Sequence, residues 1–544
     1  MITSQTRVPT PTNEPTRAYA PGTAERGELK AALQRVGHEQ VEIPALIGGR
    51  EYRSEQRFEI RAPFEHARVL ATSFHSSPQW TEQAIANAMQ AKREWAATPF
   101  HQRAAIFLRA AELLATKHRA HMNAVTMWGQ AKTAHQSEID AACEAIDFLR
   151  FNVAFAEQIL GQQPASSPGV WNQTDYRPLD GFVLAVAPFN FTSIALNLCT
   201  APALMGNVVL FKPAETATLS AWMVMQILRE AGLPDGVINF LPGHGAPVGN
   251  VALQHPDFGG LHFTGSSATF NSMWKTIAEN VGRLRQYPRI VGETGGKDFI
   301  FVHPSAADDL DAIATAVVRG GFEFQGQKCS ACSRVFIPRS LWPALKDRLV
   351  GLTEALPMGP PTDFRNFVSA VIDDRSFIRI GRYLEMASGP DARLLAGGHC
   401  DRSEGWYVRP TLVEVDDPRH PLMTEEIFGP LVSMVVYPDG QYAETLRACD
   451  EAAGYALTGS IFARDRAAIA QAALQLRSAA GNFYINDKPT GAVVGQQPFG
   501  GSRASGTNDK AGSWLNLLRW TSPRTIKETF VPSTTVPYPF MAEE

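Results

Sequence analysis

The pattern of apolar and polar positions along the chain changes at about residue 161. Between residues 81 and 155, leucine, isoleucine, phenylalanine and tryptophan recur at three- and four-residue intervals in an alanine-rich background. This spacing is typical of amphipathic helices. After residue 161, short apolar runs rich in β-branched and aromatic residues take over, and such runs are typical of buried strands. The sequence therefore predicts a helical part followed by an alternation of strands and helices.

The alternation predicts the fold class. Amphipathic segments at residues 219–231 and 270–281 separate the apolar runs. Strands that alternate with helices form parallel β-α-β units, so we expect an α/β fold with two doubly wound domains in series. The strand candidates are residues 182–187, 208–211, 237–241, 261–263, 299–302, 333–337, 431–437 and 460–462.

Three other segments fit neither pattern. Residues 1–27 are rich in threonine, proline and alanine, which predicts a flexible lead-in. Residues 170–180 lack apolar periodicity and predict a projecting hairpin. Residues 531–540 are rich in proline and threonine and predict an arm that needs a partner surface to become ordered.

Charge and hydropathy exclude several classes of function. The 54 acidic and 50 basic residues give a formal net charge of −4, without the basic excess that nucleic-acid-binding proteins need. The longest apolar stretch, residues 181–191, is broken by Pro188 and Asn190 and is too short to cross a bilayer. Residues 1–27 match neither a secretory signal nor a transit peptide. We expect a soluble cytoplasmic protein, or a mitochondrial matrix protein whose presequence has been removed.

Two motifs are weak candidates for ligand sites. Gly243-His-Gly-Ala-Pro-Val-Gly249 is close to a dinucleotide fingerprint, but its last glycine is one position late, so we predict a plain loop. Cys329-Ser-Ala-Cys332 has the spacing of a zinc or redox pair, yet neither a second cysteine pair nor a thioredoxin-like pattern accompanies it. The chain has six cysteines, and we expect reduced thiols and no bound metal.

Three polar residues occur where catalysis would need them. Cys329 has small and polar neighbours, which predicts an exposed thiol that can act as a nucleophile. Glu293 lies in a glycine-rich turn before a strand, and Asn190 follows the strand candidate 182–187. Ligands bind at the carboxyl edge of open α/β sheets. A capping role for Glu293 and a turn role for Asn190 are the ordinary alternatives.

Seven short motifs occur in order along the chain. They are Pro188-Phe-Asn190, Lys212-Pro-Ala-Glu215, Phe263-Thr-Gly-Ser266, Glu293-Thr-Gly-Gly-Lys297, Gly326-Gln-Lys-Cys329, Glu425-Glu-Ile-Phe-Gly-Pro430 and Pro498-Phe-Gly-Gly501. Together they resemble the aldehyde dehydrogenase superfamily over roughly residues 40–530. The resemblance implies two α/β domains, one that binds NAD and one that is catalytic, with a small oligomerisation element.

Four longer stretches are similar to one branch of that superfamily. Residues 322–334, 481–488, 495–501 and 503–508 resemble the 1-pyrroline-5-carboxylate, or L-glutamate γ-semialdehyde, dehydrogenases. Enzymes of that branch oxidise L-glutamate γ-semialdehyde to L-glutamate with NAD, the last step of proline breakdown. The resemblance implies this small-molecule substrate, NAD as the cofactor, and a homodimer or larger homo-oligomer, without nucleic-acid or membrane partners.

The resemblance assigns catalytic roles to the three polar residues. Cys329 attacks the aldehyde carbon to form a thiohemiacetal, which hydride loss converts into a thioester. The Asn190 amide and the Cys329 backbone N–H hold the developing oxyanion. Glu293 activates the water that hydrolyses the thioester, which needs a pKa raised by partial burial. Cys332 has no role in the chemistry, and we expect it to pack in the core.

The resemblance also implies the contacts of the two ligands. A carboxylate at Glu215 accepts bonds from a ribose 2′-hydroxyl and repels a 2′-phosphate, which favours NAD over NADP. Glu144 is a candidate partner for the α-ammonium group of the substrate, and a solvated helix face is the alternative. The implied cofactor residues are Ala187, Lys212, Glu215, Gly265, Ser266, Ser267, Ala268, Thr269, Glu426 and Phe428. The implied substrate residues are Ser330, Gly491, Ala492, Phe191, Phe499 and Glu144.

The expected domain boundaries follow from the motifs. We assign residues 41–168 and 182–296 to the NAD-binding domain and residues 297–504 to the catalytic domain. The lead-in is then residues 1–40, and the oligomerisation hairpin and C-terminal arm are residues 169–181 and 505–544.

Two rival functions remain open. The same chemistry on another semialdehyde, such as succinate semialdehyde, differs only in the missing α-ammonium group. A non-catalytic protein on this scaffold is the other rival, but it has no physical need for Cys329, Glu293 and Asn190 together. The flanks of the matched region are too short for a flavin-dependent barrel domain, which argues against a bifunctional enzyme.

Overall fold

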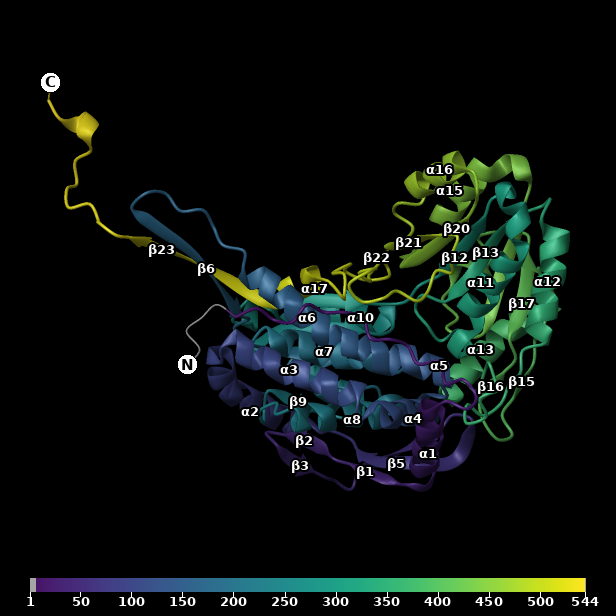
Figure 1. The fold of residues 1–544 in the computed structure, drawn as a ribbon, viewed down its shortest axis with the longest axis horizontal. Coiled ribbons are helices and arrows are strands. Elements are labelled where there is room, and N and C mark those ends of the chain that lie inside the picture. The colour runs from purple at the N-terminus through teal and green to yellow at the C-terminus, as the bar shows by residue number, and fades with distance from the viewer. Residues whose placement is uncertain (1–5, 544) are drawn as a thin grey trace.

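The computed structural model describes residues 6–543, and its core consists of two seven-stranded sheets covered by helices (Figure 1). In the first sheet all neighbouring strands run parallel except at the edge formed by β2 and β3. Its order is β11 (Arg289–Glu293), β10 (Phe258–Thr264), β7 (Phe182–Val186), β8 (Val208–Lys212), β9 (Ile238–Phe240), β2 (Ala45–Ile47) and β3 (Arg50–Tyr52).

The second sheet is parallel except for its edge strand β14. Its order is β14 (Ala392–Ala396), β17 (Thr411–Val415), β18 (Leu431–Tyr437), β13 (Cys332–Pro338), β12 (Asp298–Val302), β20 (Thr458–Phe462) and β21 (Asn482–Ile485). All eight predicted strands are present. The predicted α/β fold is confirmed, and the domain boundaries remain a prediction.

The helical part before residue 161 is also as predicted. Its long helices are α2 (Pro78–Ala97), α3 (Phe100–Ala115), α4 (Arg119–Gln130) and α6 (Glu144–Leu160). None of the helices within residues 6–543 combines the length and the apolar character that a membrane span requires.

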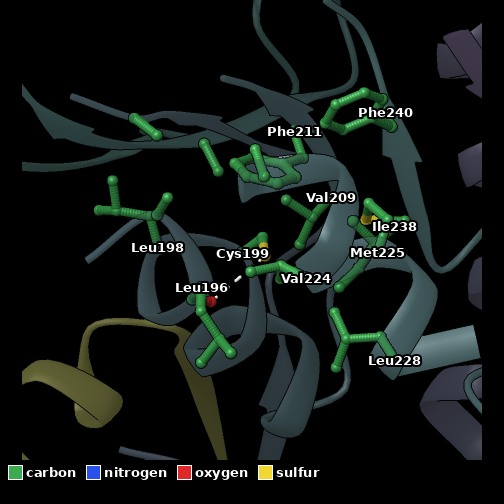
Figure 2. Packing of buried hydrophobic residues seen from close by; sticks show 14 of the residues in the cluster. Leu196, Leu198, Cys199, Val209, Phe211, Val224, Met225, Leu228, Ile238 and Phe240 are labelled. Atoms are coloured by element: carbon green, nitrogen blue, oxygen red, sulfur yellow. Dashed lines mark hydrogen bonds between the residues drawn. The ribbon is translucent and has the colours of Figure 1, made fainter. Parts of the chain in front are cut away.

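The core of the first domain explains why its strands read as continuous apolar runs. Strand β8 is buried on both faces, as a central parallel strand is. Figure 2 shows side chains of β8 and β9 packed with those of α7 (Thr192–Leu204) and α8 (Thr218–Glu230). Cys199 lies in this cluster, where its thiol donates to the Leu196 carbonyl (3.2 Å). Cys332 is equally a packing residue, with 1% exposure at the start of β13.

The N-terminal segment packs against the helices, so the prediction of a flexible lead-in is wrong for the described residues. Tyr19 is buried, and its hydroxyl donates to Glu138 Oε2 (2.7 Å). Asn13 Nδ2 donates to Asp147 Oδ2 (2.8 Å), and helix α1 (Ala24–His38) follows. Buried carboxylates hold a segment whose composition resembles that of a linker. Residues 1–5 of the predicted lead-in lie outside the described residues.

The predicted hairpin at residues 170–180 is instead one strand of a ribbon. Strand β6 (Val170–Pro178) pairs antiparallel with β23 (Thr521–Thr529), which comes from the far end of the chain. The ribbon projects from the body, and the arm beyond it extends further (Figure 1). Apolar side chains of the arm are exposed, among them Val531 and Phe540.

The third correction concerns residues 243–249, for which we predicted a plain loop. Helix α9 (Gly245–Ala252) begins there. Pro247 lies in the first turn of this helix, where a missing backbone N–H breaks no intrahelical hydrogen bond.

Candidate active site

The three candidate catalytic residues come from the carboxyl ends of strands and from the loop before β13. Asn190 follows β7, Glu293 is the last residue of β11, and Cys329 precedes β13. Cys329 lines two cavities at once. We name them the Lys212 cleft, of about 580 Å³, and the Phe191 cavity, of about 360 Å³. A thiol at this position is accessible from both sides.

The loop before Cys329 is fixed in an unusual backbone conformation. Phe324, Gln325 and Gly326 all have positive φ angles, of 51°, 56° and 64°. A Cβ atom at Gly326 would lie 2.3 Å from the Gly429 carbonyl oxygen, so only glycine fits there. The Gln325 side chain accepts from Ser369 N (3.0 Å) and donates to the Ala370 carbonyl (2.8 Å). These contacts hold the strained turn and so position the thiol.

The surroundings of Cys329 keep its thiol protonated. Cys329 is only 8% exposed, so the predicted exposure is wrong, although the side chain lines both cavities. Burial is the main factor that raises the pKa of the thiol well above its ordinary value, and Glu293, Asp298 and Glu426 raise it further. The backbone N–H of Cys329 acts in the opposite direction.

Asn190 presents its amide next to the cysteine loop. The residue is 3% exposed and lines the Lys212 cleft together with Cys329. Its Nδ2 atom donates to the Gln327 carbonyl (3.1 Å). A neutral donor held in this way suits the stabilisation of negative charge on a bound substrate.

Glu293 stands between the Phe191 cavity and a much smaller one. The small cavity, which we name the Lys510 cavity, has a volume of about 30 Å³, and Glu293 lines both. Burial raises the pKa of the carboxyl to about 8, while the charge of Lys510 lowers it. In its deprotonated form, a carboxyl group with such a pKa is basic enough to accept a proton from an attacking water.

The Lys212 cleft brings together eight of the ten predicted cofactor residues. Gly265 and Ser266 lie at the start of α10 (Ser267–Asn280), and Ser266 caps this helix by accepting from Thr269 N (3.2 Å). Ser267 and Ala268 do not line the cleft, and the Ser267 hydroxyl donates to the Ala504 carbonyl (3.0 Å). The eight residues that line it are Ala187, Lys212, Glu215, Gly265, Ser266, Thr269, Glu426 and Phe428.

The cleft carries charges that local motifs did not indicate. Arg375 and Arg379 line it from α13 (Asp374–Ala387), a helix of the second domain. His244 lies 3.0 Å from Glu215 Oε2 through its Nδ1 atom. Burial lowers the pKa of Lys212 to about 8. Arg375 and Arg379 are far from Cys329 in sequence, and no motif marked them.

The Phe191 cavity contains all six predicted substrate residues. Ser330 Oγ donates to Thr490 Oγ1 (2.9 Å), and the Phe191 ring lies 4.2 Å from Lys132 Nζ. The polar residues that sequence reasoning missed include Asn13, from the segment predicted to be flexible, and Lys328, beside the cysteine. The predicted residues that line the cavity are Glu144, Phe191, Ser330, Gly491, Ala492 and Phe499.

Glu144 does not lie on a solvated helix face. It begins α6 and lines the Phe191 cavity, where the Ser193 hydroxyl donates to its Oε2 atom (2.5 Å). Burial and then the nearby Asp140 raise the pKa of Glu144 to about 8. A nearby cation would stabilise the ionised form of a carboxyl group in such surroundings.

Comparisons with known proteins agree with this geometry. A family model described as "Aldehyde dehydrogenase family" matches residues 50–526. The chain belongs to the aldehyde dehydrogenase family. It is 54% identical to the mitochondrial delta-1-pyrroline-5-carboxylate dehydrogenase of Dictyostelium discoideum, over 99% of this chain and 97% of that protein. It is 48% identical to the human protein of the same name, over 97% of this chain and 94% of the human one.

A solved structure is similar to this chain over its full length. The delta-pyrroline-5-carboxylate dehydrogenase of Mycobacterium tuberculosis, whose structure is described as bound with NAD, superposes with a TM-score of 0.96. It is 52% identical and covers 100% of both chains.

Proposed function

We propose that this chain oxidises L-glutamate γ-semialdehyde, the open form of 1-pyrroline-5-carboxylate, to L-glutamate with NAD. The observation that carries the proposal is the Phe191 cavity, which joins the Cys329 thiol to the half-buried carboxyl group of Glu144 and to the small residues Gly491 and Ala492. Small residues allow backbone amides to approach a substrate carboxylate closely. The relatives named above are dehydrogenases of this substrate.

The Lys212 cleft fits a dinucleotide. Its volume, about 580 Å³, lies within the range of ordinary ligand sites. The N-terminal end of α10 lines the cleft at Ser266 and Thr269, where the positive end of the helix dipole favours a pyrophosphate, and Glu215 offers acceptors to ribose hydroxyls. Glu426 lines the cleft near Cys329, where it would hold the second ribose. When bound, NAD would supply the hydride acceptor of the reaction.

Residues of this chain carry out the other steps of the reaction. The Cys329 thiol loses its proton to water, and the sulfur bonds to the aldehyde carbon to give a thiohemiacetal, with the oxyanion between Asn190 Nδ2 and the Cys329 backbone N–H. Each well-placed donor contributes about 3 kcal/mol to the transition state. Loss of hydride leaves a thioester on Cys329. Glu293 removes a proton from the attacking water, and hydrolysis of the thioester releases glutamate.

We expect Asn190→Ala to slow the formation of the thiohemiacetal. Loss of one oxyanion donor reduces the rate by about 10²- to 10³-fold. The measurement is the rate of the first-turnover NADH burst with 1-pyrroline-5-carboxylate. Asn152→Ala is a matched control, because Asn152 is another buried asparagine. Its Nδ2 atom donates to Asn197 Oδ1 (2.8 Å), and the residue lines neither the Lys212 cleft nor the Phe191 cavity. Equal burst rates in the two variants would refute the role of Asn190.

Glu144→Gln tests the substrate class. Loss of a carboxylate that pairs with a buried ammonium group costs about 2 kcal/mol or more, so we expect kcat/KM with glutamate γ-semialdehyde to fall about 30-fold. Succinate semialdehyde lacks the ammonium group, and its kcat/KM is expected to change little. Both substrates are compared in wild type and variant. An equal loss with both would contradict recognition of the amino group and favour the plain semialdehyde.

We also propose that the ribbon and arm join copies of the chain into a homo-oligomer. The ribbon exposes Trp171 and Ile526, and the arm exposes Val531, Val536 and Phe540. Such apolar groups along a projecting edge favour a second copy as the partner. Removal of residues 531–544 should reduce the number of chains in the assembly, which analytical ultracentrifugation measures as a lower mass of the particle. We expect the protein to work in an aqueous compartment, the cytoplasm or the mitochondrial matrix.

A further inference from the structure

We propose that Lys510 is a positioning residue for the Glu293 base, with an ammonium group whose charge favours the ionised form of the Glu293 carboxyl group. The proposal rests on the proposed function, because it assigns a task within the hydrolytic half of that reaction. Four observations carry it: the attachment of the Lys510 segment to β11, the shared cavity, the anchoring of the ammonium group and the surrounding charges.

The segment that carries Lys510 runs along the strand that carries Glu293. Gly506 forms an antiparallel bridge with Glu293 itself. On either side, Gly292 N donates to Thr507 Oγ1 (2.9 Å) and Thr294 N donates to the Ser505 carbonyl (3.0 Å). The two segments therefore hold a fixed register, and Lys510 follows three residues after the last of these contacts.

Glu293 and Lys510 face the same small space. Both line the Lys510 cavity, whose volume is about 30 Å³. Oε1 of Glu293 is buried and finds no hydrogen-bond donor among residues 6–543. A buried carboxylate oxygen without a donor is costly, and a cation across the cavity is the feature that offsets this cost.

Several oxygen atoms hold the ammonium group at the edge of the cavity. Lys510 Nζ donates to the carbonyls of Gly481 (2.8 Å) and Gly500 (3.0 Å), and Asn482 Oδ1 lies at 3.4 Å. Lys510 has a φ angle of 52°, a conformation that is uncommon for a side chain of this size. Such strain is retained where the surrounding contacts fix it, and it clusters at functional sites.

Lys510 is the cation that acts on Glu293 from within this cavity. Among the described residues that line the cavity, the other titratable groups are His262 and Asp509. Burial lowers the pKa of His262 to about 3, so its ring is neutral. The Asp509 carboxyl group accepts a hydrogen bond from the Thr507 hydroxyl, and its Oδ1 atom lies 3.2 Å from Arg519 Nε. Within residues 6–543, Lys510 is also the one group whose charge lowers the pKa of Glu293 against burial.

Two acidic groups of the Phe191 cavity lie near Glu293. Glu293 raises the pKa of both Cys329 and Glu144. Without Lys510, the effect of burial on Glu293 would be unopposed and would favour its protonated form further. The remaining charged residues of the Phe191 cavity are Glu14, Asp140, Asp147, Lys328 and Lys488.

The test compares Lys510→Met with Lys510→Arg. Loss of a nearby opposite charge raises a carboxyl pKa by about one to two units, so the acidic limb of the steady-state kcat profile should move up by that amount in Lys510→Met. Lys510→Arg keeps the positive charge, so the acidic limb of its kcat profile is expected to stay at the wild-type pH. Lys510→Gln, which retains a donor without the charge, replaces the methionine variant if that protein does not fold.

A second readout does not depend on turnover. The infrared band of the protonated Glu293 carboxyl group, identified by its loss in Glu293→Gln, is titrated in the free proteins and should shift in parallel with the kcat limb. If Lys510→Met and Lys510→Gln lower the rate at every pH and shift neither the kcat limb nor the band, Lys510 has only a structural role and the proposal is overturned. Absence of an NADH burst in the wild type would refute the proposed function instead, and the infrared titration would still decide the role of Lys510.

Discussion

Cys329→Ala is expected to abolish aldehyde oxidation while NAD still binds with its wild-type affinity. The sulfur forms the bond that holds the substrate through hydride loss, and removal of a catalytic nucleophile lowers turnover by about 10⁴-fold or more. The Lys212 cleft keeps Lys212, Glu215 and Glu426 in the variant. The measurements are NADH production at 340 nm with 1-pyrroline-5-carboxylate, and a fluorescence titration of NAD.

Cys332→Ala is the matched control. Cys332 follows three positions later, but it is 1% exposed and packs at the start of β13. Its substitution removes a small buried group and costs stability, so the melting temperature should fall while kcat stays near the wild-type value. A residual NADH burst in Cys329→Ala, or its loss in Cys332→Ala, would contradict the assignment of Cys329 as the nucleophile.

The sequence predicts the centre of the site well because the three catalytic residues stand in short motifs next to predicted strands. Asn190 and Glu293 stand at the ends of parallel strands, and such strand ends meet at one edge of a sheet. Cys329 precedes a strand of the second sheet, and a short apolar run in the sequence marks that strand. Local motifs therefore contain both the identity of these residues and their position in the fold.

Residues joined only by long-range contacts are those that the sequence did not predict. Asn13 Nδ2 donates to the Val494 carbonyl (2.9 Å), a contact between segments almost a whole chain apart. Strand β6 finds its partner beyond residue 520 in the same way. Lys510 lies in a polar segment that resembles a surface loop, and only its packing beside β11 brings it to Glu293. The composition of a segment does not show which distant part of the chain it will pack against.

Glu293→Gln is expected to separate the two halves of the reaction. Glutamine is similar in size but cannot accept a proton, so the thioester forms and its hydrolysis stalls. The first-turnover NADH burst should remain, and steady-state turnover should fall by about 10²- to 10⁴-fold, the usual contribution of a general base. Rapid-mixing absorbance gives the burst, and mass spectrometry of the quenched protein should detect the acyl group on Cys329.

The pH dependence of turnover gives the same test a second form. Burial raises the pKa of Glu293 to about 8, and a general base acts only in its deprotonated form. Wild-type turnover limited by hydrolysis should therefore rise as the pH increases through about 8 and level off above it, and the Gln variant should lack this limb. Normal turnover in Glu293→Gln, or a limb that persists in it, would transfer the role of base to another group. Among the residues that line the Phe191 cavity, Glu144 is then the next candidate, since its pKa is also raised to about 8.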